Sequence, residues 1–270
     1  MLKPYYRTVL IYLVFASCWV YFSDSLVGLF FHTKEMIILV QNLKGFVFVG
    51  ITSLLLLSLL RTDFGRIEQI NHQLRQSYDQ TLQGWVQVMD IRHEETGEHS
   101  LRVTRMAIKM AELMGIEGDE LTWLARGALM HDAGKVGIPD AILIKPGRLT
   151  DEERAIVQQH PLIARDMMWD IEFLKPSVDI PYGHHERWDG SGYPEGLKGT
   201  ETPLAARMFA VIDVYDALLE ERVYKQPWSE ARVLEYLEEQ AGTLFDPEMI
   251  RLFIDHYDEI KASAKQRSLF

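Results

Sequence analysis

Histidine and carboxylate side chains gather in a few short motifs of this 270-residue chain. Glu95 and His99 are four positions apart, so on a helix they lie on one side, one turn from each other. His131 and Asp132 are adjacent and directly follow the apolar stretch 121–130. An imidazole next to a carboxylate suits a site with two metal ions, because the histidine can hold one ion while the carboxylate bridges to the other.

The residues after His131-Asp132 make this motif more specific than a chance dipeptide. Gly134 permits a close approach of backbone, since it carries no side chain. Lys135 supplies a positive charge that a phosphate group can accept as a partner. The motif therefore indicates metal-assisted chemistry on a phosphate.

A second histidine-rich segment begins at His184 and His185 and ends at Pro194. Two adjacent imidazoles can serve two neighbouring ions. The stretch 189–192 is predicted to be a loop, because its glycines permit positive φ. Tyr193 then places an aromatic ring on a backbone stiffened by proline, which suits stacking on a base.

Other candidates lie between and after these motifs. His160 precedes Pro161, and Asp213 lies in the apolar stretch 204–219, where a carboxylate needs a partner or a metal. Asp216, one turn further, is placed to orient a ligand. The candidate metal ligands are Glu95, His99, His131, Asp132, His160, His184, His185 and Asp213. Nitrogen and oxygen donors without any thiolate favour two or three divalent ions, Fe or Mn before Zn.

These motifs together resemble the HD-GYP family, a branch of the HD-domain metal-dependent phosphohydrolases. The resemblance runs from about Trp85 to Phe253 and includes Ile138-Pro139-Asp140, Gly192-Tyr193-Pro194 and Phe245-Asp246-Pro247. It implies an all-α domain around a central metal cluster, and hydrolysis of cyclic di-GMP to pGpG or GMP. Glu95 occupies the place of the glutamate found in members with three ions.

The resemblance also implies which residues contact the substrate. Lys135, Tyr193, Arg222 and Lys225 match the family's substrate-binding positions, and His131, Asp132 and Lys135 match its catalytic motif. We therefore expect in-line hydrolysis of a phosphodiester, with Asp132 bridging two ions and the three cations offsetting charge on the phosphate. Three alternatives remain: another cyclic dinucleotide such as cyclic GMP-AMP, a receptor that does not hydrolyse its ligand, and a general nucleotidase or phosphatase.

Helices are predicted to position all of these side chains. Residues 62–90 contain no proline, and Ile67, Ile70 and Leu74 recur at helical spacing. This helix is either a parallel coiled coil in a homodimer or the first helix of the catalytic domain. Thr150 and Glu153 form the pattern of a capping box, so a helix should begin there, with His160 near its far end.

The first 60 residues differ from the rest in being strongly apolar. The stretches 8–23 and 45–60 carry no charge, and flanking aromatic residues extend them towards the roughly 20 residues that span a bilayer. Lys3, Arg7, Arg61 and Arg66 flank the pair, which predicts a hairpin in the bacterial inner membrane with both ends in the cytoplasm. A signal peptide and a buried soluble hairpin are the alternatives.

The predicted organisation is a transmembrane hairpin, a linking helix, a phosphodiesterase domain and a tail, at 1–61, 62–84, 85–262 and 263–270. The net charge of −11 argues against a polymeric nucleic acid as partner, which needs a basic face. It is compatible with one small anionic ligand, because bound metals and a few cations reverse the local sign. A single cysteine, Cys18, excludes an intrachain disulfide.

Overall fold

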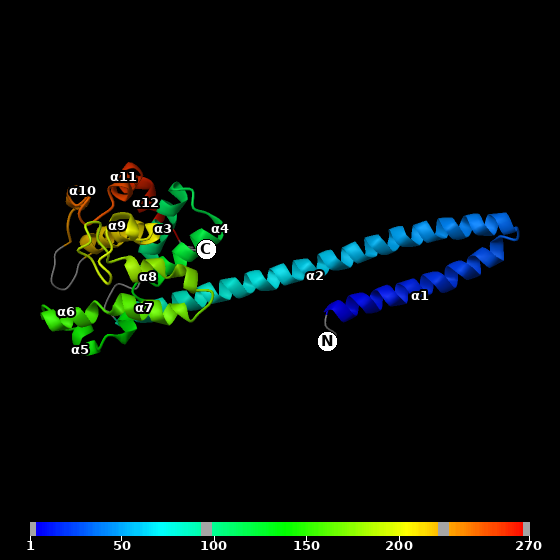
Figure 1. The fold of residues 1–270 in the computed structure, drawn as a ribbon, viewed down its shortest axis with the longest axis horizontal. Coiled ribbons are helices and arrows are strands. Elements are labelled where there is room, and N and C mark those ends of the chain that lie inside the picture. The colour runs from blue at the N-terminus through cyan, green and yellow to red at the C-terminus, as the bar shows by residue number, and fades with distance from the viewer. Residues whose placement is uncertain (1–3, 93–98, 221–226, 267–270) are drawn as a thin grey trace. The chain divides into compact units, whose positions relative to one another are not determined.

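The computed structural model describes residues 4–92, 99–220 and 227–266 (Figure 1). Helices account for the regular structure of these ranges, and the single bridge there joins Ala241 to Phe245. The expectation of an all-α chain is therefore confirmed for the described residues. The chain divides into two compact units, Met1–Tyr78 and Asp79–Phe270.

The first unit is a pair of helices, α1 (Pro4–Phe30) and the N-terminal part of α2 (Lys34–Arg92). Trp19 of α1 packs against Phe48 of α2, with ring centroids 5.9 Å apart. Polar contacts join the two helices near both ends of the pair: Lys44 with Asp24, and the Thr8 hydroxyl with Asp63 at 3.0 Å. Most large apolar side chains of this unit are exposed, and both helices are long and apolar enough to cross a membrane.

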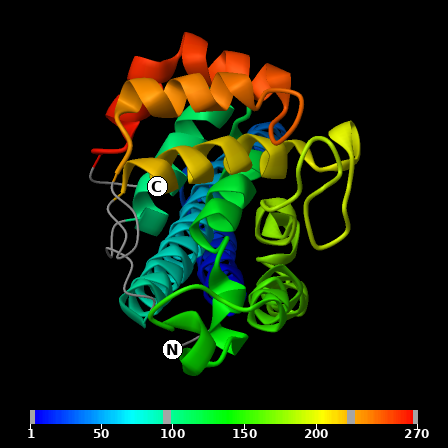
Figure 2. The same cartoon turned by 90° about the vertical axis from the view of Figure 1, so that its left-hand side faces the viewer.

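The second unit contains the remaining helices around one main core. They are α3 (His99–Leu113), α4 (Gly118–Leu129), η1 (Ala133–Gly137), α5 (Asp140–Leu143), α6 (Asp151–Val157), α7 (His160–Trp169), η2 (Lys175–Ser177), α8 (Asp179–Gly183), η3 (Gly199–Glu201), α9 (Leu204–Leu219), α10 (Glu230–Glu239), α11 (Pro247–Asp255) and α12 (Tyr257–Ser263). Figure 2 shows α9, in yellow, below the orange and red C-terminal helices. Phe209 of α9, Met106 of α3 and Phe253 of α11 are fully buried in this core.

The C-terminal end of α2 belongs to the second unit. Leu82 and Val86 are buried against Leu129, Met130 and Ala133, which lead into and follow the His131-Asp132 motif. The sequence left two alternatives for residues 62–90, and only the part from Asp79 onwards packs as a helix of the domain. It gives α2 a direct contact with the backbone that carries the candidate metal ligands.

The capping box predicted at Thr150 is present. Its side chain accepts from the backbone N–H of Glu153, whose carboxylate accepts from the backbone N–H of Thr150 at 2.8 Å. His160 lies just past the far end of this helix, but the start of a new helix there was not predicted: α6 ends at Val157 and α7 begins at His160. Pro161 lacks a backbone N–H and is tolerated in the first turn of a helix but not in its interior, so the chain starts a new helix there.

Candidate metal centre

Two groups of candidate ligands lie next to each other in the second unit. Asp132, His160, His184 and His185 each offer an atom within 4.8 Å of the others, and His99, His131 and Asp213 do the same. The groups adjoin, since the rings of His131 and His184 have centroids 5.4 Å apart. Of the eight ligands predicted from sequence, the structure brings these seven together. Glu95, the eighth, lies outside the described residues.

Asp132 faces both groups with different oxygen atoms. Its Oδ1 lies 3.4 Å from Nε2 of His160 and 4.0 Å from Nε2 of His184. Its Oδ2 lies 3.2 Å from Nε2 of His131, which belongs to the other group. Asp132 thus presents one oxygen to each group, as a carboxylate shared between two ions would have to do.

The backbone fixes how three of the histidines present their nitrogens. Nδ1 of His131, His160 and His184 lies 2.9, 2.8 and 3.0 Å from the carbonyl oxygens of Ala128, Val157 and Ile180. A carbonyl only accepts, so Nδ1 carries the proton and the lone pair of the neutral ring is on Nε2. In all three residues Nε2 is buried and has no hydrogen-bond partner. Leaving such atoms unsatisfied costs about 1–3 kcal/mol each, and a metal ion would satisfy them.

Burial controls the protonation of the first group. It lowers the pKa of His185 to about 4, and it lowers the pKa of His184 and of His160 below their ordinary value. The three rings are therefore neutral at pH 7, which is the form that binds a metal. Although burial opposes it, Lys135 and His131 hold the pKa of Asp132 well below its usual range, so this residue is a carboxylate.

In the second group, nearby carboxylates outweigh burial and favour a protonated histidine. Burial disfavours a charge on His99, but Asp213 and Asp216 outweigh it and raise its pKa to about 11. Asp213 remains ionised because His99 and His131 lower its pKa despite burial. A proton on His99 thus balances the two carboxylates, and a divalent ion at Nε2 would replace that proton.

Asp216 orients His99, as its position one turn from Asp213 predicts. Its Oδ2 lies 2.7 Å from Nδ1 of His99, and Arg102 donates to both of its oxygens at 2.6 and 2.7 Å. Arg102 also pairs with Glu220. Arg102 was not predicted from the sequence, since nothing local connects positions 102 and 216.

Two glycines allow the ligands to converge. A Cβ on Gly134 would overlap the carbonyl oxygen of His160, so only glycine lets η1 approach α7 at this point. A Cβ on Gly192 would overlap the backbone of Glu186 and Arg187. The loop 189–192 was predicted, but only Gly190 has a positive φ, of 84°. Gly192 is required by space rather than by its backbone angle.

Tyr193 lies over the first group. Its ring stacks on that of His185 with centroids 4.7 Å apart, and its backbone N–H donates to the carbonyl of His185 at 3.2 Å. Lys135 lies beside the same group, with Nζ 2.6 Å from Oδ2 of Asp132. These are the two predicted substrate contacts that the structure describes, and Arg222 and Lys225 lie outside the described residues.

Glu186 holds the loop that follows Tyr193. Its buried carboxylate accepts from the backbone N–H groups of Glu195, Gly196 and Leu197 at 2.7, 3.1 and 3.0 Å. No role was predicted for Glu186, although it directly follows His184 and His185.

Comparison with known proteins agrees with this geometry. The family model for the HD domain matches residues 85–249. The 3′3′-cGAMP-specific phosphodiesterase 2 of Vibrio cholerae is 36% identical over 70% of this chain and 37% of its own length. The cyclic di-GMP phosphodiesterase response regulator RpfG of Xanthomonas campestris is 39% identical over 63% of this chain and 46% of its own length. The chain thus spans less than half of either relative.

A solved structure shares the fold. The crystal structure of a cyclic GMP-AMP specific phosphodiesterase of Vibrio cholerae superposes with a TM-score of 0.53 at 17% identity, covering 69% of this chain and 51% of that one. The family match extends over more than half of the residues. The chain therefore belongs to the HD domain family, and its Gly192-Tyr193-Pro194 motif and relatives assign it to the HD-GYP branch, as its sequence predicts.

Proposed function

We propose that this protein is a membrane-anchored, metal-dependent phosphodiesterase that hydrolyses cyclic di-GMP to pGpG or GMP in bacterial signalling. The observation that carries the proposal is the position of Asp132 between two groups of ligands, with one oxygen towards each. The relatives support it, because they are named as phosphodiesterases for cyclic di-GMP and for 3′3′-cGAMP.

The donor set fits divalent ions and contains no thiolate. His160, His184 and His185 would hold one ion and His99, His131 and Asp213 another, with Asp132 shared between them. Fe and Mn suit these nitrogen and oxygen donors. Such ions supply Lewis acidity, which activates water and offsets negative charge on a phosphate. Glu95 is proposed as a ligand of a third ion.

The chain itself positions and neutralises the substrate. Lys135 stands beside Asp132 with a side chain that is partly exposed, so its ammonium group can donate to a phosphate oxygen. Tyr193 presents an aromatic ring next to His185 for contact with a base. Arg222 and Lys225 are proposed to add charge at the phosphate. His131 and Asp132 hold the reacting groups in place, and Asp216 keeps the ring of His99 oriented.

The first unit is proposed as the anchor. Its two helices meet the length and apolarity needed for a span, their large side chains are exposed, and cations flank the pair. We therefore propose the bacterial inner membrane as its location, with the catalytic unit in the cytoplasm. A homodimer is proposed through α2, where Ile67, Ile70 and Leu74 are exposed at coiled-coil spacing.

The test is turnover by the full-length protein, purified without oxygen in detergent and analysed for metal. Cyclic di-GMP and 3′3′-cGAMP are assayed side by side with Mn or Fe, and Asp132→Asn serves as the inactive control. We expect pGpG or GMP from cyclic di-GMP with the wild type and no product with the variant. Equal turnover by both proteins would overturn the assignment of the centre.

3′3′-cGAMP is a second candidate substrate, which a relative supports by its name. The Vibrio cholerae relative that aligns with this chain over 197 residues is specific for 3′3′-cGAMP by name. A clear preference for 3′3′-cGAMP in the same assay would establish this alternative. Recovery of either dinucleotide intact but bound would instead show a receptor.

A further inference from the structure

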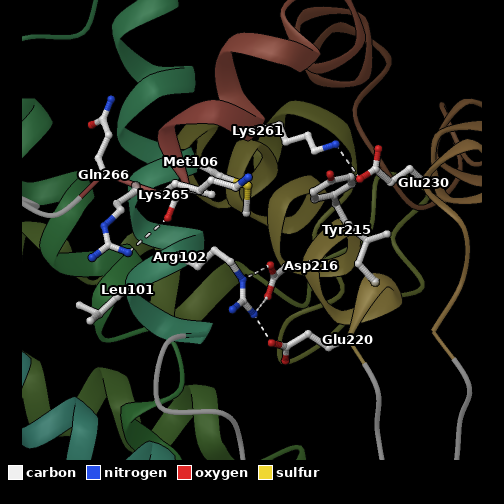
Figure 3. A pocket seen from close by; sticks show the side chains of 13 residues that line it. Leu101, Arg102, Met106, Tyr215, Asp216, Glu220, Glu230, Lys261, Lys265 and Gln266 are labelled. Atoms are coloured by element: carbon white, nitrogen blue, oxygen red, sulfur yellow. Dashed lines mark hydrogen bonds and ion pairs between the residues drawn. The ribbon is translucent and has the colours of Figure 1, made fainter.

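Asp216, which contacts His99, also lines a cavity of about 670 Å³. It is formed by α3, α9, the start of α10 and the end of α12, all within the second unit. Figure 3 shows Arg102, Asp216 and Glu220 along one wall and Lys261 with Glu230 along another. The volume falls within the range of about 300–1,000 Å³ that is usual for small-molecule sites. Of the predicted site residues that the structure describes, Asp216 alone lines it.

The charges of this cavity are only partly balanced. Arg102 pairs with Asp216 and Glu220, and Lys261 pairs with Glu230 at 2.6 Å. In contrast, Arg105 and Lys265, the other two cations in the lining, form no ion pair within the described ranges. The cavity therefore has excess positive charge in a chain whose net charge is −11.

Arg105 has hydrogen-bonding capacity left over. Its Nη1 donates to the carbonyl oxygen of Ala264 at 3.3 Å, whereas its Nε is buried without a partner. A guanidinium group offers several donors in a fixed fork that matches phosphate or carboxylate oxygens. A ligand oxygen is the group that would satisfy it.

The rest of the lining indicates what else the ligand carries. Leu101, Met106 and Leu219 provide apolar surface, which suits a flat or apolar body attached to the anion. Glu220 and Glu230 are acceptors, which suit N–H donors of the kind found on a nucleobase. We propose that this cavity is a second, non-catalytic site for a nucleoside monophosphate, with Arg105 and Lys265 on its phosphate.

Binding there has a direct route to the metal centre. Arg102 and Glu220 line the cavity, and Arg102 holds the carboxylate that orients His99. A ligand that competes for Arg102 would therefore alter the support of a candidate metal ligand. The existence of the site, however, stands on the cavity and its cations alone.

The test is GMP binding to the full-length protein by calorimetry, with inorganic phosphate as a comparison. Lys265→Glu changes an exposed side chain, so folding is unaffected, and it should weaken GMP binding about tenfold or more through loss of a charged contact. Arg105→Gln should act in the same direction. Arg251→Glu makes a similar change of charge on an exposed residue outside the cavity and should leave binding unchanged.

Lys135→Gln separates this site from the metal centre. It removes the proposed phosphate contact at the centre and should leave GMP binding to the cavity intact, because Lys135 does not line the cavity. Failure of GMP to bind the wild type, or binding that only Lys135→Gln weakens, would overturn the proposal. Turnover of a cyclic dinucleotide by Lys265→Glu tests the proposed catalytic function separately.

Discussion

Arg102 donates to both carboxylate oxygens of Asp216, from Nε to Oδ1 at 2.6 Å and from Nη2 to Oδ2 at 2.7 Å. The same Oδ2 lies 2.7 Å from Nδ1 of His99. The carboxylate is buried, and the guanidinium holds it in one orientation. The chain Arg102–Asp216–His99 thus extends the candidate metal centre by two residues that lie outside its two ligand groups.

Asp216→Asn should weaken metal binding without removing a ligand. An amide lacks the charge that holds the Nδ1 proton of His99, and loss of such partners typically costs about 10–100-fold in metal affinity or activity. The Mn dissociation constant of the variant measures this. Asp255→Asn, an exposed carboxylate elsewhere, is the control. Wild-type Mn affinity in Asp216→Asn would contradict an orienting role.

Metal binding should depend on pH through His99. Its pKa of about 11 means that the metal-free protein carries this proton throughout neutral and mildly alkaline pH. A metal at Nε2 must displace it, so binding releases a proton and affinity rises by about tenfold per pH unit between about pH 7 and 9. Mn titrations at several pH values check the slope. An affinity that is flat over this window would show that His99 does not bind the metal.

The same pKa values set the pH dependence of folding in the metal-free protein. The pKa of His99 is raised in the folded protein. Its stabilising contribution is therefore complete below the ordinary histidine pKa and is lost only as pH rises towards about 11. The pKa of His185 is lowered to about 4 in the folded protein. As the solution is acidified, His185 therefore takes up a proton in the unfolded chain before it does so in the folded one. Stability should therefore fall from about pH 6.5 towards pH 4, which urea unfolding at several pH values will show.

Glu186→Gln should disturb the Tyr193 loop and spare the metal. The glutamine side chain keeps one acceptor oxygen and turns an amide towards backbone N–H groups that Glu186 now satisfies. We expect a loss of about 1–3 kcal/mol in the free energy of unfolding and lower turnover with unchanged metal content. Glu172→Gln, which is exposed, serves as the control. Loss of metal from Glu186→Gln would assign it a different role.

Local patterns in the sequence predicted local structure well. The apolar stretch 204–219 is α9 with the same bounds, and Thr150 with Glu153 forms the predicted capping box. Both depend on neighbours a few positions away, which the sequence displays directly. The break before His160 was missed because one proline outweighed a continuous helical pattern.

Contacts between distant positions explain what the sequence could not predict. Arg102 and Asp216 are 114 positions apart, and no periodicity connects them. Asp79 reads as a polar residue of a linking helix, yet it is buried against Arg126 of α4. The candidate ligands were found because each motif carries its own chemistry, whereas their supports depend on how the helices pack.

Asp79→Ala should destabilise the catalytic unit strongly. Nε of Arg126 donates to Oδ1 of Asp79 at 2.8 Å, and the two side chains are only 8% and 10% exposed. Removal of one partner from a buried pair leaves the other charge uncompensated, at a cost of about 3–5 kcal/mol. Glu235→Ala breaks the exposed pair with Arg232, where the expected cost is about 0–1 kcal/mol. Chemical unfolding of both variants provides the comparison.

Replacement of both partners should recover much of that loss. Asp79→Leu with Arg126→Met removes both charges and fills the space with apolar side chains, an exchange that is often neutral for buried pairs. Arg126 lies on α4 shortly before His131, so Asp79→Ala should also weaken Mn binding, whereas the double variant should restore it. If Asp79→Ala unfolds like Glu235→Ala, the pair does not secure α2 to the helix that leads into the metal centre. If the double variant is stable but binds no Mn, the charges themselves are needed to position His131.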